Sequence, residues 1–303
     1  MTHLPLTRRG FLGSLAAVSA TAGLSLPLQA AETFSLGDGQ IFALSDGTFD
    51  FPAQLWVGAS DEEKAKLGEH VTIGANAFVY RRGERVFLID AGAGNSSFIT
   101  SRFQSVGRVP AELAMLGIAR EDITDVVITH MHPDHVGGVI FDGERTFPNA
   151  KIHINAKEWA FWTRNGFATD APEGMRDMVV SLQETAGMIE DAVVLQNGEA
   201  DLGGVMMQPA FGHTPGHNVM MIDLGSERLL VLGDTVVSDH IHFENPSVGW
   251  ALDADPAAAQ ATRRRLLDMA ATDGLIVAAN HVTAPGLGHV ERAGDAYRFV
   301  PLG

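Results

Sequence analysis

The sequence contains no cysteine. Disulfide bridges and thiolate zinc ligands are therefore excluded, and any metal must be bound by histidine and carboxylate side chains. The sequence also has no Gly-x-Ser-x-Gly turn, the strained turn that exposes a serine nucleophile in one large class of hydrolases. Both absences argue against covalent catalysis.

Basic residues are scarce as well. Lysine and arginine number 21 against 37 aspartates and glutamates, which gives a formal net charge of −16. A surface this acidic repels phosphate backbones, so we expect no nucleic-acid partner. The length of 303 residues and the apolar content of 46% are typical of a soluble α/β protein with a sizeable core. No low-complexity linker divides the chain, and we expect a single domain over residues 31–303.

Residues 1–30 have the features of a targeting segment. Arg8 and Arg9 precede Phe11-Leu12 and a mildly apolar run that ends in the small residues Ala30-Ala31. This arrangement resembles the twin-arginine export signal of bacteria. A membrane anchor is the alternative, but the run from 12 to 28 is short beside the about 20 apolar residues that span a bilayer. We therefore expect a cleaved signal, a periplasmic or secreted protein, and no membrane span in the mature chain.

One short stretch stands out within the remainder of the chain. After apolar residues 126–128, the sequence reads Thr-His-Met-His-Pro-Asp-His over positions 129–135. Core packing does not explain three histidines and a carboxylate so close together, because each polar group needs a partner if it is buried. Alternation along an extended backbone places His130 and His132 on one side, and Pro133 then turns Asp134 and His135 toward another point. The pattern predicts a metal site, with a second ion close by.

The pattern of apolar residues indicates alternating strands and helices. Expected strands cover residues 34–45, 77–80, 86–89, 125–129, 151–154, 219–224, 229–234 and 275–278. Expected helices cover residues 61–67, capped by Ser60, 156–164, and 256–271, capped by Asp255 with Pro256 at its first position, and surface helices or a lid lie between 165 and 190. Two of the strand pairs form hairpins with the same layout, an apolar strand, a Gly/Glu/Arg turn and an apolar strand ending in aspartate, which indicates two related sheet halves.

Three more residues are candidate metal ligands because they follow predicted strands or lie in a glycine-rich loop. His213 lies in Gly-His-Thr-Pro-Gly-His (212–217), Asp234 ends the second hairpin, and His281 follows the strand at 275–278. Ligands at strand ends converge on one edge of an α/β sheet. The chain thus offers five histidines and two aspartates for two metal ions.

The order and spacing of these seven residues resemble the metallo-β-lactamase superfamily, over roughly residues 34 to 300. The resemblance implies an αββα sandwich in the α/β class and two zinc ions per chain. It implies that one zinc is held by His130, His132 and His213, the other by Asp134, His135 and His281, and that Asp234 bridges the two ions. It also implies that Asp90, in Asp-Ala-Gly, orients one of the ligand histidines.

Differences within the superfamily narrow the expected activity. Redox members carry glutamate where this chain has His132, and related β-lactamases lack the carboxylate at Asp234. Lactonases, thioesterases of the glyoxalase II type and methyl parathion hydrolase-like esterases remain. Residues 280–289 look most like methyl parathion hydrolase and its lactonase relatives.

The resemblance therefore implies a dinuclear zinc hydrolase that uses a metal-bridging hydroxide to cleave lactones or aryl esters, with phosphotriesters as a further class. Asp134 is expected to orient the nucleophile and to pass a proton to the leaving group. A glyoxalase II-type thioesterase, with Arg263 to Arg265 binding glutathione carboxylates, and a non-catalytic periplasmic metal-binding protein are the alternatives. Other divalent metals could replace zinc, and a homodimer is expected from the resemblance alone.

Other histidines and aromatic residues have lesser expected roles. His217 is expected in a supporting or loop position, His153 in the core, and the pair His240 and His242 at a pocket rim or on the surface, while His289 is a candidate support of the site. An apolar substrate needs an aromatic wall, and Trp162 and Phe103 are the expected substrate contacts. Trp162 shares a helix face with Trp159, which also fits plain core packing.

Overall fold

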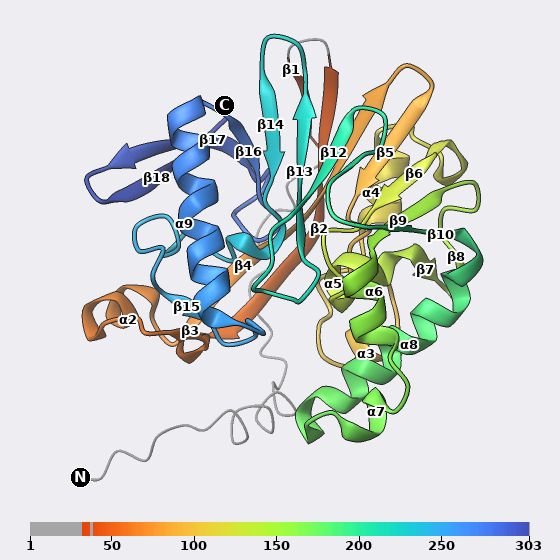
Figure 1. Ribbon diagram of the computed structural model, residues 1–303, viewed down its shortest axis with the longest axis horizontal. Helices are drawn as coiled ribbons and strands as arrows, with labels where there is room; N and C mark the ends of the chain where they lie inside the picture. The colour runs from red at the N-terminus through yellow and green to blue at the C-terminus, as the bar shows by residue number, and fades with distance from the viewer. Residues whose placement is uncertain (1–31, 37–38, 303) are drawn as a thin grey trace.

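The computed structural model describes residues 32–36 and 39–302 (Figure 1). The expected export signal at residues 1–30 lies outside the described residues. Within the described ranges, no helix is both long enough and apolar enough to cross a membrane.

Two seven-stranded sheets form the centre of the molecule. The first has the order β1-β2-β4-β5-β6-β9-β10 and the second β11-β12-β13-β14-β16-β17-β18. The first sheet consists of β1 (Glu32–Leu36), β2 (Gly39–Pro52), β4 (His70–Arg82), β5 (Arg85–Ile89), β6 (Asp125–Val127), β9 (Lys151–Asn155) and β10 (Val193–Gln196). The second consists of β11 (Ala200–Asp201), β12 (Val205–Pro209), β13 (Asn218–Asp223), β14 (Arg228–Val231), β16 (Ile276–Ala278), β17 (Leu287–Ala293) and β18 (Ala296–Pro301).

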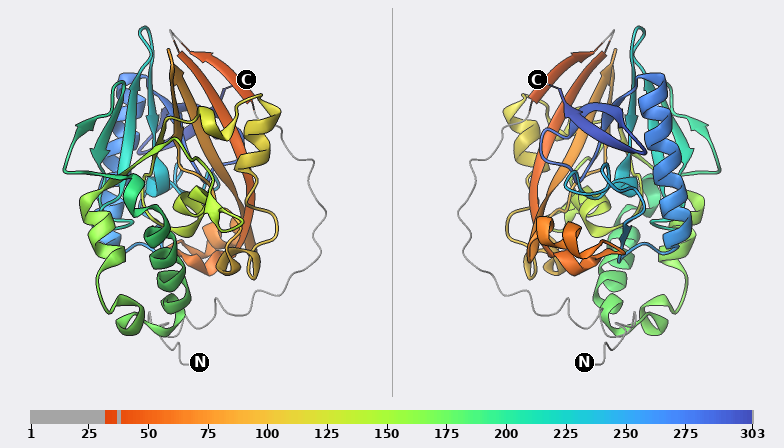
Figure 2. Two further views of the ribbon diagram at one scale, coloured as in Figure 1. Left: turned by 90° about the vertical axis from the view of Figure 1, so that its right-hand side faces the viewer. Right: turned by 90° about the vertical axis from the view of Figure 1, so that its left-hand side faces the viewer.

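The described residues form eight α-helices, and some of them cover the outer faces of the sheets. They are α2 (Asp61–Leu67), α3 (Ser97–Thr100), α4 (Val109–Met115), α5 (Pro133–Val136), α6 (Ala156–Thr163), α7 (Phe167–Asp170), α8 (Arg176–Ile189) and α9 (Pro256–Asp273). Two small ribbons complete the strands: β3 (Trp56–Val57) with β15 (Gly249–Trp250), and β7 (Ile140–Phe141) with β8 (Glu144–Arg145). Figure 2 shows α4 (yellow) and α9 (blue) on opposite outer sides of the two sheets. The expected αββα sandwich is confirmed.

Three apolar layers hold the sandwich together. Between the sheets, Phe78 and Ile89 of the first sheet pack with Met220 and Leu229 of the second, all without solvent exposure. A second layer joins the first sheet to α4 and α8, and a third joins the second sheet to α9 through Leu266 and neighbouring residues. Burial of this apolar area is the main stabilising contribution to folding.

The two predicted hairpins lie in different sheets. β4 and β5 pair antiparallel in the first sheet, and β13 and β14 pair antiparallel in the second. Each hairpin is followed outward by a parallel strand, β6 beside β5 and β16 beside β14. This shared order agrees with the predicted relation between two sheet halves, and it brings the carboxyl ends of the strands to one edge.

Local sequence signals explain where the elements begin. Ser60 accepts a hydrogen bond from the Glu63 amide while the Glu63 carboxylate accepts one from the Ser60 amide, a reciprocal cap that starts α2. Asp255 accepts from the Ala258 amide, and Pro256 stands at the first position of α9. Both predicted caps are confirmed.

Some predicted strand limits are wrong. β2 continues to Pro52, beyond the expected end at residue 45, because it pairs with β4 along its whole length across a register shift at Ser45/Gly47. β6 ends at Val127 and not at residue 129. The reason is that Thr129 leaves the ladder: its amide donates to the Asp90 side chain and its carbonyl accepts from the Asn218 amide.

Candidate metal centre

The histidine cluster changes direction at Pro133. His132 lies just before α5, and Pro133 occupies the first helical position, so Asp134 and His135 fall in the first turn of this short helix. Proline is suited to that position because its fixed φ fits a helix and no amide is lost there. The predicted division is found: His130 and His132 belong to one set of converging side chains, and Asp134 and His135 to another.

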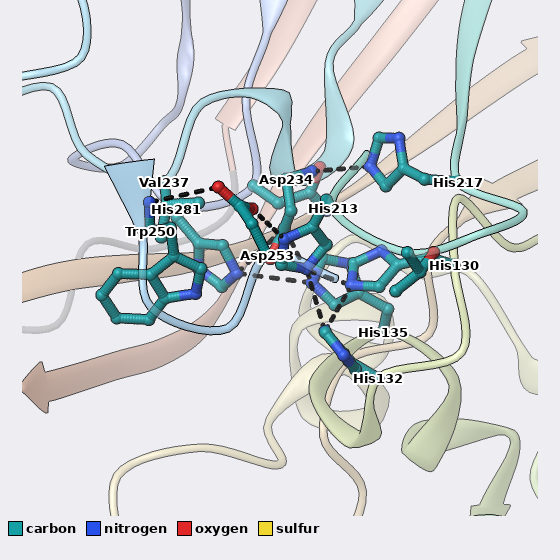
Figure 3. Close-up of polar contacts among 12 residues, drawn as sticks. His130, His132, His135, His213, His217, Asp234, Val237, Trp250, Asp253 and His281 are labelled. Carbon is teal, nitrogen blue, oxygen red and sulfur yellow. Dashed lines mark hydrogen bonds and ion pairs between the residues drawn. The ribbon is translucent and has the colours of Figure 1, made fainter. Parts of the chain in front are cut away.

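His130, His132 and His213 form what we call the three-histidine group. The His130 Nε2 and His213 Nε2 atoms each lie 2.9 Å from His132 Nδ1. With one Asp234 oxygen, the ligand atoms of this set all lie within 4.8 Å of one another. Figure 3 shows the three rings gathered below Asp234.

Asp134, His135 and His281 form the Asp134 group. The Asp134 Oδ2 atom lies 3.3 Å from His281 Nε2 and 3.5 Å from His135 Nε2. The two imidazole nitrogens are 3.3 Å apart. His281 reaches this point from the loop after β16 in the other sheet, so the group joins both halves of the sandwich.

Asp234 lies between the two groups, and each of its oxygens faces one of them. Its Oδ2 is 3.2 Å from His213 Nε2 and 3.7 Å from His130 Nε2. Its Oδ1 is 3.1 Å from His135 Nε2 and 3.2 Å from His281 Nε2, yet this buried oxygen makes no hydrogen bond within the described chain. A buried carboxylate oxygen without a hydrogen bond is costly, which fits a cation as its partner.

Burial and the nearby carboxylates shift the pKa values of the histidines in opposite directions. Burial, with repulsion from neighbouring imidazoles, lowers the pKa of His132 to about 3 and that of His130 well below its usual range. Burial opposes protonation of His213 and His281 too, but nearby carboxylates raise their pKa values to about 9 and about 10. Metal binding at this site would take the place of protonation at the ligand histidines.

The ligand rings are held by hydrogen bonds at their other nitrogen. Asp90 Oδ2 accepts from His135 Nδ1 at 2.8 Å, so the expected orienting role of Asp90 has the geometry it requires. The Gly74 carbonyl accepts from His281 Nδ1 at 2.8 Å, and Asp253 Oδ1 accepts from His213 Nδ1 at 2.9 Å. Each contact leaves the opposite nitrogen as the one that faces the group.

His217 supports Asp234 and is not part of either group. Its Nε2 accepts from the Asp234 amide at 3.0 Å, and its Nδ1 donates to the Ala210 carbonyl at 3.1 Å. Gly233 is required beside it, since a Cβ there would lie 2.6 Å from His217 Nε2 and its φ is +53°. The expected supporting position of His217 is confirmed.

Aromatic side chains border the site on two sides. Trp162 is 2% exposed, and its ring meets the edge of His132 with centroids 5.5 Å apart. Near His281, Phe49 lies at 6.0 Å, and Phe103 packs against Phe49 at 4.9 Å while remaining partly exposed. Contact of Trp162 or Phe103 with a substrate stays a prediction.

The remaining histidines differ from one another. His153 is buried and bonded to Asp125 and Gln196, as expected of a core residue. His240 is exposed, but the expectation for His242 is wrong: it is fully buried, and its Nδ1 accepts from the Val237 amide. His289 lies half-buried on β17 and, among the described residues, makes no hydrogen bond or ion pair to either group.

Arg263 is unsuited to binding a glutathione carboxylate. Its guanidinium is fully buried and donates to the carbonyls of Thr235, Pro246 and Val248. Arg264 and Arg265 are exposed on α9. The sequence does not show this difference, because the three arginines are consecutive and only the helix packing orients them.

Two buried acids at the site were missed from the sequence. Asp253 holds His213, but it stands two residues before the Asp255 cap and looks like part of the turn into α9. Glu158 is buried within α6 and bonds to the loops that carry His132 and His213. The one sequence feature that could have indicated Glu158 is its position, a lone acid four residues before Trp162 on a helix face with little other charge.

The donor set fits two divalent cations. Neutral imidazole nitrogens and carboxylate oxygens are the ligands that zinc takes in proteins without cysteine. The unbonded Asp234 Oδ1 and the three close nitrogens of the three-histidine group are otherwise unexplained. Two such groups at the carboxyl ends of the strands of an αββα sandwich have the arrangement of a two-metal site.

The chain belongs to the metallo-beta-lactamase superfamily, whose family model matches residues 71–281. Ribonuclease J of Synechocystis is 35% identical over 75 residues, which is 25% of this chain and 11% of that protein. A "probable metallo-hydrolase" of Mycobacterium tuberculosis is 27% identical over 136 residues, which is 41% of this chain and 40% of that protein. The chain thus matches less than half the length of these curated relatives.

Solved structures match nearly the whole chain. The hydrolase AbOPH of the beta-lactamase superfamily has a TM-score of 0.83 at 27% identity, covering 92% of this chain and 99% of its own. AidC, described as a dizinc quorum-quenching lactonase in complex with an N-hexanoyl-L-homoserine product, has a TM-score of 0.81 at 27% identity, covering 90% and 98%. Over nearly its whole length the chain is thus similar to a hydrolase and to a lactonase, which favours catalysis over the non-catalytic alternative.

Proposed function

We propose that this protein is a dinuclear zinc hydrolase that opens lactones or cleaves aryl esters, with phosphotriesters as a further substrate class. The position of Asp234 carries the proposal most directly. Its Oδ2 faces the three-histidine group and its Oδ1 faces the Asp134 group, so a single carboxylate can serve both. Four buried histidines surround this carboxylate.

His130, His132 and His213 would hold one ion, Asp134, His135 and His281 the other, and Asp234 both. When bound, two zinc ions supply Lewis acidity toward the substrate oxygen and lower the pKa of a water molecule in the site. Other divalent metals fit the same oxygen and nitrogen donors. Zinc is favoured because the similar structure AidC is described as dizinc.

Asp134 is the acid of the site that solvent and substrate can reach. Its side chain is 20% exposed, whereas the Asp234 side chain is 6% exposed. A carboxylate at the border of the site can hold the proton of the attacking water at its free oxygen and later pass it to the leaving group. We assign that role to Asp134, in addition to its place as a ligand.

The choice of lactones and esters rests on the similar solved structures and on the aromatic side chains beside the site. AidC is a lactonase by description and shares 27% identity over 90% of this chain. Phe51 and Phe103, both partly exposed, are in edge contact at 5.9 Å, and both pack against Phe49, whose ring lies 6.0 Å from that of His281. They offer apolar surface to an acyl or aryl group. The acidic balance of the chain favours a neutral substrate over a polyanion.

A thioesterase of the glyoxalase II type remains the alternative enzyme. Its substrate carboxylates need accessible cations near the site, and the burial of Arg263 removes the best placed of the three arginines considered. Export by the twin-arginine route and a homodimer are also part of the proposal. The first rests on the Arg8-Arg9 segment and the second on the family resemblance.

A kinetic panel tests the proposed substrate class. The zinc-loaded protein would be assayed with aliphatic and aromatic lactones, p-nitrophenyl esters, a methyl phosphotriester, a thioester and a β-lactam. We expect the highest kcat/KM on a lactone or aryl ester. A preference for the thioester would support the glyoxalase II alternative, and turnover of the β-lactam alone would contradict the proposal.

A variant tests the bridging role of Asp234. Asp234→Ala is expected to lose at least one of two zinc ions and most activity, because both groups lose their shared oxygen ligand. Asp223→Ala, an exposed aspartate at the other end of the same hairpin, serves as the control and should keep both ions. Elemental analysis measures the zinc, and an Asp234→Ala protein with two ions and full turnover would refute the bridge.

A further inference from the structure

Glu158 is a fully buried carboxylate that belongs to neither ligand group. It lies in the first turn of α6, and its side chain is 0% exposed. A buried carboxylate is costly unless each oxygen is hydrogen-bonded, so its set of partners indicates why it is there.

Its two oxygens connect the two loops that carry the three-histidine group. Oε1 accepts from the Met131 amide, between His130 and His132, at 2.9 Å, and from the Trp162 indole at 2.7 Å. Oε2 accepts from the Thr214 hydroxyl, next to His213, at 2.7 Å, and from the Gly216 amide at 2.9 Å. One side chain therefore fixes both loops relative to each other.

Close packing leaves the His213 loop little freedom to move. A Cβ at Gly216 would lie 2.3 Å from the Glu158 amide nitrogen, and one at Gly212 would lie 2.2 Å from the Ala259 amide nitrogen. The loop is therefore held between the beginnings of α6 and α9. Glu158 supplies the hydrogen bonds on the α6 side of this clamp.

Only a carboxylate suits this position. Four donors converge on Glu158, and an ionised carboxylate has two oxygens that each accept more than one hydrogen bond. A glutamine would turn an NH2 group toward one pair of donors and leave a buried amide without an acceptor, which costs more than the loss of an average hydrogen bond. If the NH2 group replaces Oε1, the Trp162 indole also loses its acceptor and with it the contact that fixes its ring against His132.

We infer that Glu158 is a positioning residue that sets the spacing of the His132 and His213 ring nitrogens and thereby the metal affinity of the three-histidine group. The inference rests on the metal binding proposed above. It concerns one ion of the pair, because Glu158 bonds to residues next to the three histidines and to none next to His281.

Stepwise zinc binding by calorimetry tests the inference without measuring turnover. In Glu158→Gln, we expect one of the two ions to bind about ten- to a hundredfold more weakly, the usual effect of losing a partner behind a metal ligand, with the other unchanged. The absorption spectrum of the cobalt-loaded protein should change for one ion of the two. If Glu158 only stabilised the fold, neither the zinc affinities nor the cobalt spectrum would change.

Asp125→Asn is the matched control. Asp125 is also a buried carboxylate with four hydrogen bonds, from Arg85 Nε and Nη2, Thr124 Oγ1 and His153 Nε2, and it begins the strand whose other end leads to the histidines. This variant should lower the melting temperature and leave both zinc affinities as in the wild type. If Glu158→Gln behaves in the same way, the inference is wrong.

A milder variant keeps the test open if Glu158→Gln does not fold. Thr214→Val removes one donor to Oε2 and keeps the shape of the side chain at position 214. We expect a several-fold weaker affinity for the ion of the three-histidine group. An unchanged affinity in a folded Thr214→Val protein would overturn the inference. A wild-type protein that binds fewer than two ions would overturn the proposed function itself. Two ions that bind equally well to the wild type and to Glu158→Gln would overturn only the inference about Glu158.

Discussion

In four of the five candidate ligand histidines, a hydrogen bond at one ring nitrogen leaves the other nitrogen to face the metal groups. The acceptor is a carboxylate for His135 and His213, a main-chain carbonyl for His281 and the Thr129 hydroxyl for His130. Such partners fix the tautomer and the ring plane before any ion binds. The arrangement thus pre-organises the site at the level of single residues.

Asp90→Asn tests this selection at His135. The amide NH2 would face either the Thr129 amide or His135 Nδ1, and in the second case it would favour the tautomer whose Nε2 carries the proton and cannot bind metal. We predict that zinc in the Asp134 group binds about ten- to a hundredfold more weakly. Zinc retained per chain after dialysis, measured by elemental analysis, checks it.

Asp142→Asn is a suitable control for Asp90→Asn. Both aspartates adopt a left-handed backbone, with φ of 53° and 57°, which asparagine tolerates equally well. Asp142 is exposed and bonds Asn95 away from the metal ligands. Equal zinc retention in the two variants would show that the Asp90 carboxylate does not select the His135 tautomer.

The sequence predicted the metal-ligand candidates better than their supports. The cluster at 130–135 is visible because its residues are adjacent and unsuited to a core. Glu158 bonds to Met131 within this cluster, and Asp253 bonds to His213, each from a separate segment of the chain. A lone acid in a helix or before a cap is common in proteins that bind no metal. His242 was misplaced for a similar reason, since its partner, the Val237 amide, is recognisable only when the loop is folded.

At the scale of elements, α6 and α9 position the His213 loop through glycines. Gly212 and Gly216 allow the loop to touch the two helices, since a Cβ at either would overlap a main-chain nitrogen. The alternation of glycine, histidine and proline there predicted a loop and a ligand. It did not predict which helices would hold the loop, because α6 lies on the first sheet and α9 on the second, and only the stacking of the two sheets brings both helices to the loop.

Gly216→Ala is predicted to lower the free energy of unfolding by about 1–3 kcal/mol or more, since the added methyl overlaps the Glu158 backbone. Gly187→Ala is the control, because this exposed glycine lies within α8 and a methyl group added there would meet no atom within 4 Å. It should instead raise stability by about 0.5–1 kcal/mol through helix propensity. Urea denaturation measures both, and equal changes of one sign would contradict the clamp.

At the scale of the whole molecule, one ionic network joins the strands of the first sheet. Asp125 of β6 bonds Arg85 of β5 and His153 of β9, and His153 bonds Gln196 of β10. Burial opposes ionisation, but the hydrogen bonds from His153 and Arg85 hold the pKa of Asp125 well below its usual value of 3.8. A lowered folded-state pKa stabilises the fold above 3.8, and this contribution is lost as the pH falls below that value.

We therefore predict a pH-dependent difference between the wild type and Asp125→Asn. The wild type should be the more stable at pH 7. The difference should narrow below about pH 4, where Asp125 of the unfolded chain becomes protonated while the folded protein keeps it ionised. Urea denaturation of both proteins without metal, from pH 7 to pH 3, gives the comparison. A difference that stays constant over this range would contradict the assigned role of the carboxylate.

The amino-terminal segment bears on where the whole protein acts. Replacing both Arg8 and Arg9 by lysine should hold the protein in the cytoplasm if export depends on the arginine pair. Cell fractionation with an immunoblot would measure the distribution. Unchanged export of the double variant would contradict a twin-arginine route.

The two-ion hydrolase is tested most directly by measuring hydrolysis against the zinc added per chain. Metal-free protein would be titrated with zinc while the initial rate is recorded on the lactone or aryl ester that the kinetic panel identifies as the best substrate. We predict a rate that rises until two equivalents are bound and then stays constant, because Asp234 serves both groups. A plateau at one equivalent, or no hydrolysis of any lactone or aryl ester at any zinc content, would contradict the two-ion hydrolase.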